Sequence, residues 1–205
     1  MTTIACIVEG DGEVAALPVL LRRLGALLTP DRWVDVLPPI RVRRDRFLNR
    51  PDEFRRQLLL ASGKCGASGW ILVLLDADDD CPAVLGARIL EDGRQVVAHQ
   101  RMSVVLANRE YESWFIAAAN SLSGHRGFTH DGRDEPDPDR PRDAKGWIKR
   151  RMAGRSYREI TDQPAMSAKF DLETALDRSR SFRKLCHEWT RQMDLTTPNA
   201  TDGNC

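Results

Sequence analysis

The sequence lacks any long uninterrupted run of apolar residues. No stretch approaches the roughly 20 apolar residues that a helix needs to cross a bilayer. The first residues, 1–9, have no basic segment followed by a long apolar one, as a signal peptide would. Hydrophobic residues make up 41% of the 205 residues, an ordinary value for a globular domain. We therefore expect a cytoplasmic protein without a membrane partner.

The sequence also lacks closely spaced cysteine pairs, which argues against a zinc-binding domain and against a domain held together by disulfides. The chain has five cysteines, an odd number, and they are widely scattered. No two of them have the close spacing of a zinc site. Structural disulfides are rare in a reducing compartment. The sequence therefore predicts reduced thiols without a structural role.

Lysine is the third scarcity, since only five of the 31 basic residues are lysines and the net charge is +1. The planar guanidinium of arginine suits phosphate recognition, although a GC-rich genome also produces an arginine-rich chain. Arginines are densest between residues 41 and 56. The candidates for contacts with a nucleic-acid backbone there are Arg41, Arg43, Arg44 and Arg46. A charged edge strand facing solvent is the alternative interpretation.

Apolar runs and helical patterns alternate along the first part of the chain. Strands are predicted at 4–8, 33–42, 70–75 and 102–107, and helices at 14–28, 52–61, 82–97 and 110–120. The continuous apolar run at 70–75 is typical of a parallel strand that is buried on both faces. Two prolines at 38 and 39 confine pairing of the second strand to an edge or interrupt it, and Gly93 is expected to interrupt the third helix. This order predicts an α/β fold with a mostly parallel sheet flanked by helices.

The second part of the chain has a different composition. Residues 123–142 are rich in Gly, Pro, Asp and Arg and are predicted to form a long loop. Helices are predicted at 144–153, 166–176 and 181–193. We therefore divide the chain into an α/β core at 1–120, a loop with C-terminal helices packed on that core at 121–195, and a flexible tail at 196–205.

Acidic residues follow two of the predicted strands. Glu9 ends the first, and Asp76 and Asp78 follow the run at 70–75. Parallel strands bring their carboxyl ends to one edge of the sheet, where ligands bind. In extended backbone Asp76 and Asp78 would also point to the same side. Clustered carboxylates repel one another unless a cation neutralises them, and Mg²⁺ (or Mn²⁺) prefers oxygen ligands. These three residues are therefore predicted metal ligands.

Other acids near these strand ends have two interpretations. Glu13 lies within a turn of Glu9 and is either part of the site or an ordinary acid in a first helical turn. Asp79 and Asp80 fit helix caps. Glu110 and Glu112 follow the strand at 102–107 and either complete the metal site or stabilise a helix N-terminus.

The segments Val8-Glu9-Gly10-Asp11-Gly12-Glu13 and Leu74-Leu75-Asp76-Ala77-Asp78 resemble the paired motifs of the Toprim superfamily. These motifs are a glutamate after the first strand and an Asp-x-Asp after a later one. The superfamily includes topoisomerases, primases, OLD-type nucleases and RecR-like repair proteins. The second glutamate, Glu13, is most similar to the OLD-type nucleases. The resemblance implies a Toprim/Rossmann-like fold and a metal-dependent reaction on nucleic acid.

Nearly the whole chain is similar to the bacterial domain of unknown function family 4276. The similar segments are 107–115, 157–162 and 171–185. Members of that family usually lie beside ATPases of the ABC or AAA type, which implies an ATPase partner and a role in anti-phage defence. OLD-type nucleases use a lysine contributed after the Toprim core, which implies a catalytic role for Lys169, with Lys145 as the other candidate. A solvated surface lysine is the alternative for each.

These observations predict a nuclease that cleaves phosphodiester bonds of DNA or RNA with Mg²⁺. The predicted catalytic residues are Glu9, Glu13, Asp76, Asp78 and Lys169, and the predicted metal ligands are Glu9, Asp76, Asp78, Glu110 and Glu112. The first alternative is a non-catalytic Toprim-like subunit that binds metal or nucleic acid and regulates an ATPase. The second is a phosphotransfer enzyme acting on nucleotides, although the turn at 10–13 is acidic for a phosphate-binding loop.

Overall fold

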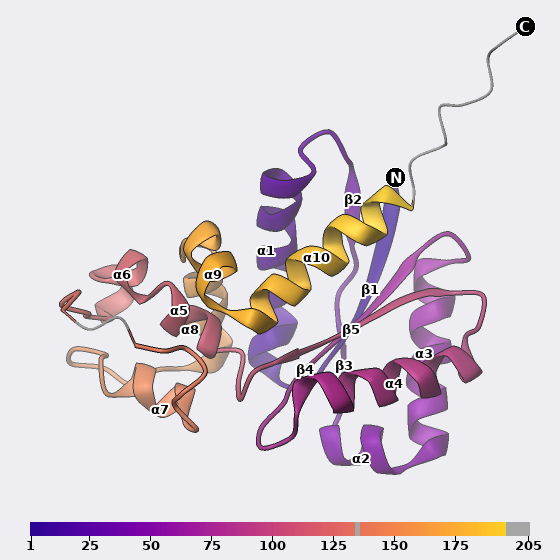
Figure 1. Cartoon of the computed structure of the whole chain (residues 1–205), viewed down its shortest axis with the longest axis horizontal. Coiled ribbons are helices and arrows are strands. Elements are labelled where there is room, and N and C mark those ends of the chain that lie inside the picture. The colour runs from indigo at the N-terminus through magenta and orange to yellow at the C-terminus, as the bar shows by residue number, and fades with distance from the viewer. Residues whose placement is uncertain (134–135, 196–205) are drawn as a thin grey trace, which may run out of the picture.

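The computed structural model describes residues 1–133 and 136–195 and shows an α/β fold (Figure 1). Within this part of the chain the sheet has five strands, and every pairing is parallel. The strands are β1 (Thr2–Val8), β2 (Val34–Val36), β3 (Ile40–Arg41), β4 (Trp70–Asp76) and β5 (Arg101–Ala107). Their order is β2-β1-β4-β5, with β3 also paired to β1. The predicted parallel sheet flanked by helices is confirmed, whereas the predicted flexible tail at 196–205 lies outside the described residues.

Helices cover both faces of this sheet. The first four are α1 (Asp11–Leu28), α2 (Arg44–Asn49), α3 (Pro51–Cys65) and α4 (Pro82–Val96). The later ones are α5 (Ser113–Ala117), α6 (Ala119–Leu122), the short 3₁₀ helix η1 (His125–Gly127), α7 (Ala144–Lys149), α8 (Glu159–Ser167), α9 (Leu172–Arg178) and α10 (Arg180–Asp194). Helices α1 and α10 pack on one face of the sheet, and α3 and α4 pack on the other (Figure 1).

The continuous apolar character of β4 follows from burial on both faces. Trp70, Leu72 and Leu74 belong to the core beneath α1 and α10, while Ile71 and Val73 belong to the core beneath α3 and α4. This alternation has the period of two that a strand imposes. Asp76 ends the strand in step with the first set, so it lies on the side of α1 and the C-terminal helices.

The direction in which the chain winds reverses between β1 and β4. Helix α1 leads from β1 to β2 on one side of β1, whereas α3 leads to β4 on the other side. A reversal of this kind opens a crevice beyond the carboxyl ends of the two central strands, the usual place for a ligand in an α/β sheet. Glu9 directly follows β1 and Asp76 ends β4, so both lie at this crevice.

The predicted strand at 33–42 is divided into β2 and β3. Leu37 still donates its N–H to the carbonyl of Ile4 (3.0 Å), but the two prolines that follow have no N–H to continue the ladder. The alternative interpretation of a charged edge strand holds for Arg41, which is exposed in β3, whereas the residues from Arg44 to Asn49 form α2.

Two predicted helices differ in detail. Helix α4 runs without a break through Gly93, so the predicted interruption is wrong. A Cβ at Gly93 would lie 2.6 Å from Sδ of Met102, so the glycine allows α4 to pack closely on β5. The predicted helix at 110–120 is instead a turn followed by the short helices α5 and α6.

The predicted helix at 166–176 is wrong. Helix α8 begins at Glu159 and ends at Ser167, and α9 begins only after Asp171, whose Oδ1 accepts a hydrogen bond from the Thr174 N–H (2.7 Å). The buried face of α8 carries polar side chains, among them Asp162 and Gln163, so no apolar periodicity marked residues 159–165 as helical. Similarly, the helix predicted at 144–153 ends at Lys149.

Within the described residues, no helix combines the length and the apolar character that crossing a bilayer requires. Four cysteines lie in this part of the chain, and all four are free thiols: Cys6, Cys65, Cys81 and Cys186.

Candidate functional site

Four carboxylates gather at the crevice and surround one ammonium group. We call Glu9, Glu13, Asp76 and Glu112 the inner cluster, and the ammonium belongs to Lys145 on α7. The carboxylates come from the end of β1, the first turn of α1, the end of β4 and the turn before α5. Glu13 and Glu112 are almost completely buried, with 4% and 0% of their surface exposed. Burial, and then the charges of neighbouring members, raise the pKa values of Glu9, Asp76 and Glu112.

Glu13 reaches the cluster because two glycines let other groups approach the backbone. The Glu13 carboxylate packs against the Cα of Gly10, and the side-chain oxygen of Gln163 packs against Gly12, so a Cβ at either glycine would overlap these atoms. Gln163 on α8 donates its Nε2–H to Oε1 of Glu13 (3.0 Å). The glycines at 10 and 12 therefore bring α8 onto the first turn of α1 and fix the Glu13 carboxylate.

Gly12→Ala is expected to lower the free energy of unfolding by about 1–3 kcal/mol, because overpacking forces α8 away from α1. The matched control is Gly63→Ala on α3, where a Cβ would meet no atom within 4 Å. The control should be neutral or stabilise by up to about 1 kcal/mol, since alanine favours a helix over glycine. Urea unfolding monitored by circular dichroism measures both. Equal stabilities for the two variants would contradict this packing.

Asp76 is held rigidly at the end of β4. Its Oδ1 accepts the backbone N–H of Tyr111 (2.8 Å), and its Oδ2 lies 3.9 Å from Nζ of Lys145. Burial raises the pKa of the Asp76 carboxyl well above its ordinary value, and the neighbouring carboxylates, first Glu112 and then Glu13, raise it further. A cation that joined Lys145 at this position would favour the ionised form of Asp76.

Glu112 is the most deeply buried carboxylate of the cluster. Its Oε1 accepts the hydroxyl hydrogen of Tyr157 (2.8 Å). Burial raises the pKa of Glu112 to about 8, although Lys145 and the tyrosine hydroxyl act in the opposite direction. At neutral pH the Glu112 carboxyl therefore holds a proton for much of the time.

A backbone hydrogen bond and ion pairs hold Lys145 in place. Glu110, a predicted metal ligand, instead accepts the backbone N–H of Lys145 through Oε2 (2.8 Å) at the start of α7. The Lys145 ammonium lies 3.7 Å from Oε2 of Glu159 on α8. Burial acts to lower the pKa of Lys145, but the surrounding carboxylates, of which Glu112 contributes most, outweigh it and hold the pKa above its ordinary range. The lysine therefore remains charged inside the cluster.

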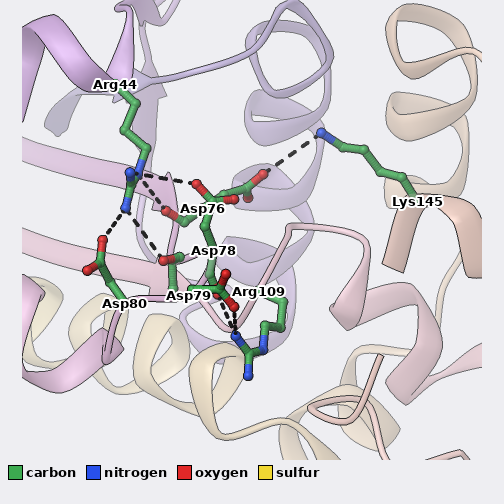
Figure 2. Close-up of polar contacts among 8 residues, drawn as sticks. Arg44, Asp76, Asp78, Asp79, Asp80, Arg109 and Lys145 are labelled. Carbon is green, nitrogen blue, oxygen red and sulfur yellow. Dashed lines mark hydrogen bonds and ion pairs between the residues drawn. The ribbon is translucent and has the colours of Figure 1, made fainter. Parts of the chain in front are cut away.

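Asp78 lies on the outer side of the cluster, in a loop that Arg44 clamps. Asp78 has a left-handed backbone (φ 50°), so the extended conformation ends at Asp76 and the two aspartates do not share one side as predicted. Figure 2 shows Arg44 reaching across this loop. Its Nε donates to the carbonyl of Asp76 (3.3 Å), its Nη1 lies 3.6 Å from Oδ2 of Asp78, and its Nη2 contacts the carboxylate of Asp80.

A second arginine braces the same loop from β5. Arg109 also has a left-handed backbone (φ 64°), and its carbonyl accepts the N–H of Asp78 (2.9 Å). Its Nη1 donates to the carbonyl of Asp78 (3.0 Å) and to the carboxylate of Asp79 (2.8 Å). Asp79 and Asp80 therefore pair with arginines, and the predicted caps are wrong because α4 begins after Cys81 without a side-chain cap. Asp78 and Arg109, which contact each other, thus both have left-handed backbone conformations. Backbone strain of this kind is concentrated at functional sites.

Arg44→Ala is expected to lower the free energy of unfolding by about 1–3 kcal/mol, because the carbonyls and carboxylates that Arg44 holds lose a partly buried charged donor. Arg43→Ala is the matched control, since Arg43 is exposed and its side chain makes no hydrogen bond or ion pair within residues 1–133 and 136–195. It should change stability by less than about 0.5 kcal/mol. Urea midpoints compare the two variants, and an equal loss in both would show that Arg44 does not clamp the loop.

The inner cluster has donors that fit a hard divalent cation. Oε2 of Glu9, Oε2 of Glu13 and Oε2 of Glu112 are buried and have no hydrogen-bond donor among the described residues. Buried carboxylate oxygens without a partner are costly unless a cation or water satisfies them. Within the same residues, no group of three or more His, Cys, Asp or Glu side chains is arranged to enclose a metal ion. Mg²⁺ needs no such cage, since it is usually held by one or two carboxylates, waters and substrate phosphates.

The remaining predicted residues lie farther from the inner cluster. Lys169, after the end of α8, is exposed and its side chain makes no ion pair with any carboxylate in the described part of the chain. Lys145, the other candidate, lies inside the inner cluster, near Asp76 and Glu159. Of the predicted arginines, Arg44 contacts the loop after β4, residues 77–81, which we call the acidic loop. Arg41, Arg43 and Arg46 instead line a separate pocket.

Three residues that hold the site were not among the predicted site residues: Tyr157, Gln163 and Arg109. Tyr157 lies in a segment that the sequence comparison had already singled out, directly before the acidic start of α8. Gln163 carries no signal of its own, because its role depends on the close approach of α8 to Gly12. Arg109 directly follows a predicted strand and its neighbour Glu110 was considered, so its position was a usable signal.

Comparison with known proteins gives one match. Neither the curated proteins nor the solved structures include a match to the chain. A protein-family model described as "Domain of unknown function (DUF4276)" matches residues 8–189, a span that runs from the end of β1 to Trp189 on α10 and contains the inner cluster, Lys145 and the loop clamped by Arg44. The chain therefore belongs to the DUF4276 family.

Proposed function

We propose that this protein is a divalent-metal-dependent phosphodiesterase that acts on nucleic acid, as the resemblance to Toprim-like nucleases implies. The observation that carries the proposal is the inner cluster itself. Three buried carboxylate oxygens without a donor lie at the switch point of a parallel sheet, next to Asp76, whose pKa is raised by burial and then by its acidic neighbours. An arrangement that costs folding energy in this way is typical of a functional site.

The residues divide into those that would hold a metal and those that shape the site. Glu9, Glu13 and Asp76 would hold Mg²⁺ or Mn²⁺, because Glu9 and Glu13 each have a buried oxygen without a donor and Asp76 lies in the same cluster. When bound, the metal would neutralise charge on the phosphate and activate a water molecule. Asp78, on the exposed outer side, faces incoming substrate and is held in place by Arg44.

Two further groups have roles in proton and charge balance. The Lys145 ammonium, inside the cluster, can stabilise negative charge that develops on a phosphate. The Glu112 carboxyl, with its pKa near 8, can hold or release a proton close to neutral pH. Tyr157 fixes the orientation of Glu112 through its hydroxyl and does not need to touch substrate.

The direct test is cleavage of linear and supercoiled DNA, and of RNA, by the purified protein in Mg²⁺ or Mn²⁺. Cleavage that EDTA abolishes supports the proposal. No cleavage of any of these substrates in either metal, by a protein shown to be folded by circular dichroism, would contradict a phosphodiesterase that acts alone.

One observation favours a second function, a non-catalytic subunit that binds nucleic acid and regulates an ATPase. The Lys145 ammonium already supplies a counter-charge to Asp76 and Glu159, so the cluster has an internal cation without a metal. This alternative predicts that the chain binds nucleic acid equally well in Mg²⁺ and in EDTA and does not cleave it.

A further inference from the structure

A pocket lined by arginines lies beside the acidic site. It is a cavity of about 300 Å³ between β3, α2 and α3. Its charged and polar walls are Arg41, Arg43, Arg46, Glu53, Arg56 and Gln57. Four guanidinium groups therefore share one small cavity with a single carboxylate, and we call it the arginine pocket.

The carboxylate of the arginine pocket does not neutralise it. Glu53 is occupied by Arg56, whose Nη2 donates to both of its oxygens (2.9 and 2.8 Å), and by Gln57 (2.8 Å). The side chains of Arg43 and Arg46 make no hydrogen bond or ion pair within the described residues. The guanidinium groups of Arg43 and Arg46 thus remain without an ion pair after Arg56 has paired with Glu53 and Arg41 with Asp11, and the fork geometry of arginine matches the oxygens of a phosphate.

The arginine pocket is adjacent to the inner cluster on the same edge of the sheet. Arg41 pairs in register with Val8, the residue that directly precedes Glu9. The Nε of Arg41 lies 3.2 Å from Oδ1 of Asp11, two residues after Glu9. Arg44, which directly follows Arg43 at the start of α2, pairs with Asp78 and Asp80 in the loop after β4. A ligand bound in the pocket would therefore lie close to the inner cluster along this edge of the sheet.

We propose that the arginine pocket is a phosphate subsite that binds one phosphate group of the nucleic-acid substrate beside the bond to be cleaved. A cluster of carboxylates repels a polyanion such as nucleic acid. A separate, positively charged site is therefore needed to bring the nucleic acid close to the carboxylates. This proposal rests on the proposed function for the identity of the ligand. Its phosphate is either an internal phosphodiester or a terminal phosphomonoester, which carries more charge.

The test is binding of fluorescently labelled single-stranded DNA, measured by anisotropy in EDTA so that no cleavage is needed. The pocket variant is Arg43→Ala/Arg46→Ala. The matched control is Lys64→Ala/Arg94→Ala, which removes the same charge from the last turns of α3 and α4. We expect the pocket variant to bind about tenfold or more weakly, since two charged donors are lost, and the control to bind as the wild type does. The dependence of affinity on salt should also become shallower by about one phosphate contact.

A comparison of two DNA strands identifies which kind of phosphate the pocket binds. If the loss occurs for DNA with a 5′-phosphate but not for the same strand with a 5′-hydroxyl, the ligand is a terminal phosphate; an equal loss for both identifies an internal one. Pyrophosphate titrated into the wild type and the pocket variant by calorimetry gives a readout without nucleic acid. The subsite is overturned if the pocket variant binds DNA as tightly as the control does, or if the wild type binds neither DNA nor pyrophosphate. Pocket-dependent binding without cleavage would instead leave the subsite in place and contradict only the phosphodiesterase.

Discussion

Asp76→Asn is expected to reduce metal-dependent cleavage by about a hundredfold or more, because it removes a charged group from the centre of the inner cluster. The substitution is almost isosteric, so the hydrogen bond from the Tyr111 N–H to Oδ1 remains possible. The backbone at the end of β4 should therefore keep its shape. The loss of activity would then reflect the missing charge rather than a displaced loop.

The matched control is Asp79→Asn, three residues away in the same loop. Asp79 is exposed and pairs only with Arg109 and Arg142 among the described residues. Removing an exposed ion pair changes stability by at most about 1 kcal/mol, and the control should cleave within a few-fold of the wild type. Initial rates from a gel assay compare the two. Equal rates for Asp76→Asn and Asp79→Asn would exclude Asp76 from the reaction.

Asp76→Asn should also make the metal-free protein more stable. The pKa of Asp76 is raised in the folded protein, so its ionised form opposes folding at neutral pH. A neutral amide removes the cost of burying a charge at this position, and it also removes the repulsion from Glu112 and Glu13. A higher Tm in EDTA combined with lost cleavage is the expected signature of a residue kept for function at the expense of stability.

Stability in EDTA is expected to fall as the pH rises from about 4.5 to about 8, because the pKa values of the buried carboxyls Glu112 and Asp76 are both raised. The pKa of Glu112 is raised from 4.5 to about 8 by burial. Below pH 4.5 both the folded and the unfolded chain hold the proton; between 4.5 and 8 only the folded chain still does. Folding then takes up a proton, so its free energy becomes less favourable with rising pH, by up to about 1.4 kcal/mol for each pH unit.

Glu112→Gln tests the origin of this slope. The variant has no proton to gain or lose at this position, so its stability should decline less steeply, and it should be more stable than the wild type at pH 8. Asp76 and Glu9, whose pKa values are also raised, account for the remaining slope. Glu91→Gln on the exposed surface of α4 is the control and should leave the slope unchanged. Urea unfolding at several pH values measures all three, and identical slopes for the wild type and Glu112→Gln would contradict the assignment.

The sheet could be predicted from sequence because its strands carry a strong local signal. The run at 70–75 is apolar on both faces, and acids follow it and the first strand. Parallel pairing then requires Glu9 and Asp76 to meet at one edge, as they do. The helices after residue 120 were harder to predict, because α8 buries the polar side chains of Asp162 and Gln163 rather than an apolar stripe.

The site was predicted less completely, for a similar reason. Two of its carboxylates, Glu9 and Asp76, follow from strand ends, but its lysine does not, since Lys145 enters from a short helix that follows a long irregular segment. The sequence offered both Lys169 and Lys145 as candidates, and only the structure places the Lys145 ammonium beside Asp76 and Glu159. Arg44 could not be separated from its neighbours, because its direction depends on the start of α2. The metal itself and the nuclease activity remain predictions.

The central claim is that the inner cluster binds a divalent cation, and Mn²⁺ binding measured by electron paramagnetic resonance tests it most directly. The wild type should take up Mn²⁺ saturably, and Glu9→Gln/Asp76→Asn should weaken that binding by about tenfold or more, while circular dichroism shows both proteins folded. Mn²⁺ affinity that is unchanged in the double variant, or no saturable binding by the wild type, would contradict the claim.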